Sequence, residues 1–84
     1  MAQGPTRLTV FFGTEAERRY WVRQKDLDDS RVLLARTAGR TLNGRSEPVD
    51  TWYCSGHHGL SARSVLQLHR YIALLNFLYE KEAT

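Results

Sequence analysis

The residues most able to do chemistry are gathered in one short stretch, Thr51 to Ser61. It holds the only cysteine of the chain, Cys54, and two of its three histidines, His57 and His58. A thiolate beside an imidazole could act as a nucleophile with its base, and sulfur and imidazole nitrogen are ligands that zinc prefers. The stretch therefore raises two hypotheses, a Cys-His catalytic pair and a zinc site.

The spacing of these residues argues against both hypotheses. A structural zinc site needs four ligands, commonly in two close pairs, and the one further histidine is His69. A catalytic cysteine and its histidine usually come from separate elements rather than from one loop. A domain of 84 residues also leaves little room for a substrate pocket. We therefore expect no metal, no cofactor and no enzymatic activity, and interpret the stretch as a glycine-flanked connection from a strand to a helix.

The length and composition predict one small globular domain. Of the 84 residues, 42% are hydrophobic and 25% are charged, values typical of folded chains. A single cysteine cannot form an internal disulfide, which suits a reducing compartment. No secretory signal is recognisable, and no apolar run approaches the roughly 20 residues that span a bilayer. We expect a cytoplasmic, single-domain protein over residues 1–84, with residues 1–6 as a loose tail and no membrane contact.

The first half of the chain must build the strands that position the Cys-His-His stretch. Residues 7–12 predict a strand, because Leu8, Val10 and Phe12 fall on one side of it. Residues 14–25 leave two alternatives open. The capping-box pattern at their start favours a helix, whereas their alternation and their poorly filled helical face favour a strand. We favour a hairpin with residues 7–12.

Further strands and one long helix complete the expected fold. Residues 31–37 form a third strand or a short helix, of which we favour the strand, and residues 49–54 are predicted as a strand. Turn signals lie between them at residues 38–39 and 43–44. Residues 62–81 predict a helix, since they contain no Gly or Pro and carry apolar residues at spacings of three and four. That apolar stripe consists of Val65, Leu68, Ile72, Leu75 and Tyr79. The sequence therefore predicts an α+β fold, with a small antiparallel sheet of three to four strands from residues 7–54 and the helix packed on it.

The C-terminal helix carries more apolar residues than one sheet can cover. Further apolar side chains lie beyond the core stripe, and exposed apolar patches usually mark interaction sites. We therefore expect a small non-enzymatic regulatory or inhibitory protein, of the kind that mobile elements encode, which binds another protein or a second copy of itself as a homodimer. The candidate protein-binding residues are Tyr71, Leu74, Phe77, Leu78, Arg70 and Trp21.

Arginine supplies the alternative function, nucleic-acid binding. Residues 18–23 interleave cations with aromatic rings, the pattern of a base-stacking platform with phosphate contacts. The candidate residues are Arg18, Arg19, Trp21, Arg23, Arg36, Arg40 and Arg45. The net charge of +3 is small for such a protein, and no helix-turn-helix, zinc-finger or RNA-recognition motif is present. Nucleic acid is therefore the alternative partner.

Overall fold

The strands form one parallel sheet in which the first strand lies in the centre. The computed structural model describes residues 7–43 and 47–83, so the expected tail at 1–6 lies outside the described residues. The strands are ordered β2-β1-β3, and β1 pairs in parallel with both neighbours. In chain order the elements are β1 (Leu8–Phe12), α1 (Glu15–Gln24), η1 (Asp29–Arg31), β2 (Val32–Leu34), α2 (Ala35–Leu42), β3 (Val49–Tyr53) and α3 (Ala62–Ala83).

The expectation of an antiparallel sheet is wrong. The chain does combine helices with a small sheet and ends in a long helix, but the three described strands are all parallel. The cause is the helix between each pair of consecutive strands. A crossover helix returns the chain to the edge of the sheet where it began, so the next strand runs in the same direction.

The first of these crossovers is the segment that we assigned to a hairpin. Residues 15–24 form helix α1, and the capping box at its start is complete. The backbone N–H of Thr14 donates to Glu17 Oε1 at 2.8 Å, and the N–H of Glu17 donates to Thr14 Oγ1 at 3.1 Å. These bonds satisfy two of the donors that a helix start leaves open. The helical face looked poorly filled because a buried arginine, Arg18, occupies part of it.

The second crossover replaces part of the strand predicted at residues 31–37. Only Val32–Leu34 are extended, and the chain then enters α2 at once. Ala35, Ala38 and Leu42 are buried at helical spacing. The turn expected at residues 38–39 therefore lies inside a helix, and the one expected at residues 43–44 extends beyond the described residues.

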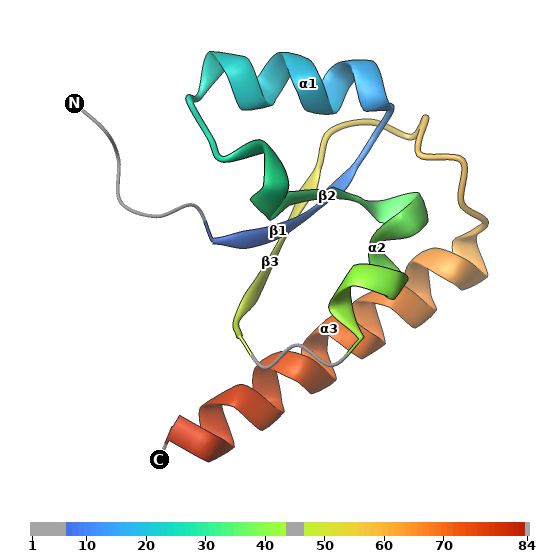
Figure 1. The fold of residues 1–84 in the computed structure, drawn as a ribbon. Coiled ribbons are helices and arrows are strands. Elements are labelled where there is room, and N and C mark those ends of the chain that lie inside the picture. Colours follow the sequence, from blue (N-terminus) through green and yellow to red (C-terminus); the bar gives the residue numbers. More distant parts are fainter. Residues whose placement is uncertain (1–6, 44–46, 84) are drawn as a thin grey trace.

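Helices cover both faces of the sheet, giving three layers (Figure 1). On one face, α2 and α3 pack against alternate residues of the strands. The core there contains Leu8, Val10, Phe12, Ala35, Ala38, Leu42, Val49 and Ile72, with Val65, Leu68 and Leu75 partly buried against it. On the other face, α1 covers Phe11. The ring centroids of Phe11 and Trp52 are 5.3 Å apart, and those of Trp21, on α1, and Trp52 are 5.8 Å apart. The predicted burial of β1 and of Ile72 on the helix stripe is confirmed.

Candidate functional site

The Cys-His-His stretch follows β3 at the edge of the sheet where the parallel strands end. The loop after β1 lies beside it, because Phe12 pairs with Tyr53 in the register of the two strands. From β1 the chain crosses to β2 on one side, whereas β3 lies on the other side. In open α/β sheets this arrangement is the switch point at which ligands commonly bind. The parallel topology therefore places this loop where open α/β sheets commonly bind a ligand.

Glu17 ties the two loops together. Its Oε1 accepts hydrogen bonds from the Thr14 backbone N–H and from Ser55 Oγ, both at 2.8 Å. These bonds hold the pKa of the Glu17 carboxyl below its ordinary value, the Thr14 bond having the largest effect. A Cβ at Gly13 would approach both Glu17 Oε1 and a ring carbon of Phe11 to 2.8 Å. A side chain at position 13 would therefore displace Phe11 or Glu17, and with Glu17 its bond to Ser55.

His58 is held by its own neighbours. Its Nδ1 accepts a hydrogen bond from the Leu60 backbone N–H at 3.1 Å, and its Nε2 lies 3.4 Å from the Tyr53 hydroxyl. The His58 ring packs edge-on against Phe12, with the ring centroids 5.9 Å apart. His69 stacks on the same phenylalanine, with the ring centroids 5.1 Å apart. His58 and His69 thus act as packing groups around Phe12.

The His57 side chain is exposed, whereas Ser55 and Cys54 make contacts within the fold. Ser55 Oγ donates to Glu17 and accepts from the His57 backbone N–H at 3.3 Å. Cys54 is half-buried, and its backbone N–H donates to the Phe12 carbonyl at 2.8 Å. Within residues 7–43 and 47–83, no group of three His, Cys, Asp or Glu side chains could hold a metal ion. The contacts of this loop join strands to helices and assemble no nucleophile with its base.

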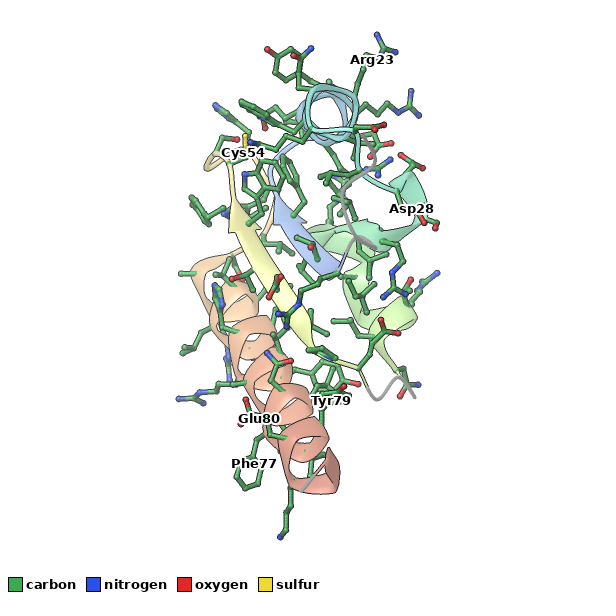
Figure 2. All side chains as sticks on the ribbon, turned by 90° about the vertical axis from the view of Figure 1, so that its left-hand side faces the viewer. Arg23, Asp28, Cys54, Phe77, Tyr79 and Glu80 are labelled. Atoms are coloured by element: carbon green, nitrogen blue, oxygen red, sulfur yellow. The ribbon has the colours of Figure 1, made fainter. Side chains whose placement is uncertain are left out.

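The outward face of α3 is the most prominent apolar surface of the described chain. Leu66 and Leu74 are each 51% exposed, Phe77 is 61% exposed and Leu78 is 45% exposed. We call these four residues, together with the exposed Arg63 and Arg70, the α3 outward face. Figure 2 shows Phe77 pointing away from the sheet. In Figure 1 the C-terminal part of α3 extends past the end of the sheet.

Two of the predicted protein-binding residues lie elsewhere. Tyr71 is half-buried and packs against the core. Trp21 belongs to α1 on the opposite side of the sheet, where its ring contacts Trp52 and Tyr20. Sequence reasoning did not select Leu66 and Arg63 as site residues, although their spacing from Arg70 and Leu74 on one helix was a usable signal.

Arg18 is a structural residue. Its Nε and Nη2 donate to Glu15 at 2.7 and 3.1 Å, and its Nη1 donates to the Val32 carbonyl at 3.0 Å. The same Nη1 lies 3.0 Å from Asp29 Oδ1. The pair with Arg18 is the main cause that lowers the pKa of Glu15 from 4.5 to about 2. A guanidinium held this way is not available to phosphate.

The other arginines of the nucleic-acid candidate set are divided between layers. Arg19 and Arg23 are exposed on α1, and Arg19 is paired with Glu15 at 2.9 Å. Arg36 and Arg40 are exposed on α2, which packs against the opposite face of the sheet. Arg45 lies outside the described residues. The described members of the set therefore form two separate groups.

No protein-family model, curated protein or solved structure matches the chain. The function must therefore be argued from its own residues. None of the described helices has the length and apolar character needed to cross a membrane.

Proposed function

We propose that this protein is a non-enzymatic binding protein, acting as a regulator or inhibitor by docking another protein onto the α3 outward face. The observation that carries the proposal is the exposure of Leu66, Leu74, Phe77 and Leu78 along one helix. Burying apolar surface stabilises a complex by roughly 25 cal/mol per Å², and exposed apolar patches are typical of interaction sites.

The two faces of α3 have different surroundings, one in the core and one in solvent. Val65, Leu68, Ile72 and Leu75 contact the core of the sheet. Leu74 and Phe77 are more than half exposed and add nothing to that core. Aromatic and arginine side chains are the usual energetic anchors of protein interfaces, and Phe77 and Arg70 supply one of each. This division supports a surface kept for a partner.

The expectation that the protein is not an enzyme is part of the proposal. Its support is the loop after β3, where Ser55 is bonded to Glu17 and His58 to Leu60 and Tyr53. A nucleophile needs a base within hydrogen-bonding reach, and these bonds direct the polar groups toward structural partners instead. The half-buried free Cys54 suits a reducing compartment such as the cytoplasm.

Affinity capture with paired variants tests the proposal. The wild-type chain, used as bait in native lysate with and without nuclease, should retain a stoichiometric protein partner in both. Leu74→Asp with Leu78→Asp should lose that partner while the far-UV circular dichroism spectrum stays unchanged. The matched control is Tyr20→Asp with Gln24→Asp, which places two aspartates at the same spacing on the exposed side of α1 and should retain the partner. Equal capture by the α3 variant, or a partner that vanishes with nuclease, would contradict the proposal.

A further inference from the structure

The α3 outward face combines its apolar residues with basic ones. Arg63, Arg70, Leu74, Phe77 and Lys81 follow one another at spacings of seven, four, three and four residues, so they lie along one line on the helix surface. All five are exposed. No acidic residue falls on this line, and Glu80 lies roughly a quarter of a turn away from it.

The two arginines of this line are available to a partner. The ion pairs found among the described residues involve Arg7, Arg18, Arg19 and Arg31. Arg63 and Arg70 form no ion pair with any of the described residues. An uncompensated charge beside an apolar patch attracts a partner of opposite sign, and it also rejects a partner of like sign.

A second copy of the chain would therefore be a poor occupant. A two-fold dimer brings the same surface of each copy together. With the helices parallel, Arg63 and Arg70 would each face their own equivalents. With the helices antiparallel and crossing between Leu74 and Phe77, Arg70 would face Lys81. Like charges meet in both arrangements, and neither is favoured.

A membrane surface is also a weaker occupant. Stable attachment to anionic lipid usually needs clusters of about four to eight basic residues or a second anchor. The line on α3 has three basic residues, with Glu80 beside them. A protein segment needs fewer charges, because Leu74, Phe77 and Leu78 would be buried in the same contact.

We propose that the partner presents an acidic amphipathic helix to the α3 outward face. Its apolar side chains cover Leu74, Phe77 and Leu78, and its Asp or Glu residues lie against Arg63 and Arg70. The distance from Arg63 to Lys81 is roughly 27 Å along a helix, which a partner helix of about 18 residues matches. This inference rests on the proposed function and names the chemistry of the partner.

Selection from a peptide library tests this inference directly. The probe is a displayed library of helical peptides of about 18 residues, which matches the length of the α3 outward face. Their polar positions vary among Glu, Gln and Lys, and their apolar positions vary among Ala, Leu, Ile and Phe. The immobilised wild-type chain should enrich peptides with Glu on the flanks of an apolar stripe. These peptides should bind about tenfold more weakly to Arg63→Glu with Arg70→Glu, and in high salt.

The charge-reversed variant is the internal control, since it should select Lys-rich peptides instead. Arg19→Glu with Arg23→Glu, which reverses two exposed arginines on α1, should leave the selection unchanged. Enrichment of neutral or basic peptides by the wild-type chain, or no enrichment at all, overturns the inference. So does dimerisation of the wild-type chain in sedimentation, or binding to phosphatidylserine vesicles that Leu74→Asp abolishes.

The selection also separates this inference from the proposed function. Neutral peptides that bind the wild-type chain but not Leu74→Asp would leave α3 as the docking surface and remove only the acidic partner. Selected peptides that bind Leu74→Asp as well as wild type would instead remove α3 as the docking surface.

Discussion

The side chain of Asn76 pairs with both backbone groups of Val49. Its Oδ1 accepts the Val49 N–H at 2.7 Å, and its Nδ2 donates to the Val49 carbonyl at 2.9 Å. Val49 begins β3, an edge strand of the sheet, and is only 2% exposed. The amide of Asn76 thus takes the place of a neighbouring strand and blocks the start of this edge against pairing with another chain.

Replacing Asn76 by alanine should lower the free energy of unfolding by about 1–3 kcal/mol, because two backbone groups of a buried residue lose their partner. Asn76→Asp should also destabilise the fold, since it keeps the acceptor but sets a carboxylate oxygen against the Val49 carbonyl in place of the donor. Urea denaturation measures both. Asn43→Ala, at an exposed position, is the control and should change the midpoint little. An equal effect at both asparagines would show that the pairing with Val49 contributes nothing.

Arg18 bonds the start of β2 as Asn76 bonds the start of β3, because its Nη1 donates a hydrogen bond to the Val32 carbonyl at 3.0 Å. Arg18→Met keeps the apolar stem but removes the donors, and we expect a loss of about 2 kcal/mol in thermal or urea unfolding. Arg19→Met is the matched control on the next residue, where the side chain is 74% exposed. A wild-type midpoint for Arg18→Met would mean that the arginine is a surface residue, as the nucleic-acid hypothesis assumed.

Glu15 should make stability depend on pH in the acid range. Because its pKa falls from 4.5 to about 2 in the folded chain, the folded state binds fewer protons than the unfolded state between these values. Its stabilising effect is therefore complete above pH 4.5 and is lost as the pH falls through about 2. Glu15→Gln should melt below wild type at pH 7, and the difference should shrink toward pH 2. Glu80→Gln, an exposed control on α3, should follow wild type, and a constant difference for Glu15→Gln would contradict the assignment.

Ile72 and Leu74 give a direct comparison between the two sides of α3. Ile72 is 4% exposed and Leu74 is 51% exposed. Ile72→Ala should cost about 2–5 kcal/mol through lost burial and a cavity, whereas Leu74→Ala should stay within about 0.5 kcal/mol of wild type. Equal losses in urea denaturation would mean that Leu74 supports the fold and is not kept for a partner.

The elements with a simple periodic pattern could be predicted from the sequence. Alternation identified β1 and β3, and spacings of three and four residues after Ser61 identified α3 nearly to its observed ends. Two elements failed for local reasons. Arg18 disguised the inner face of α1, because a buried arginine looks like a solvent-facing residue. Gly39 disguised α2, where the spacing of Ala35, Ala38 and Leu42 was the true signal.

Both errors changed the topology, because a strand–helix alternation implies a parallel sheet and a run of strands does not. They also affected the reading of the candidate site. The parallel pairing makes β1 and β3 end side by side, which places the loop after β1 next to the Cys-His-His stretch. The exposed residues of α3 were easier to anticipate, because one helix shows its surplus of apolar residues without reference to the rest of the fold. The contact of Trp21 with Trp52 could not be anticipated, because it joins segments far apart in the sequence.

The central place of β1 has a consequence for how the chain is made. Leu8–Phe12 leave the ribosome before both of the strands that pair with them. Contacts between distant segments form slowly, and one edge of this apolar strand stays unpaired until Val49–Tyr53 are synthesised. A chain that stalls before β3 exposes one whole edge of its most buried strand to other nascent chains. Pairing of this exposed edge with another unfinished chain is a route to aggregation during synthesis.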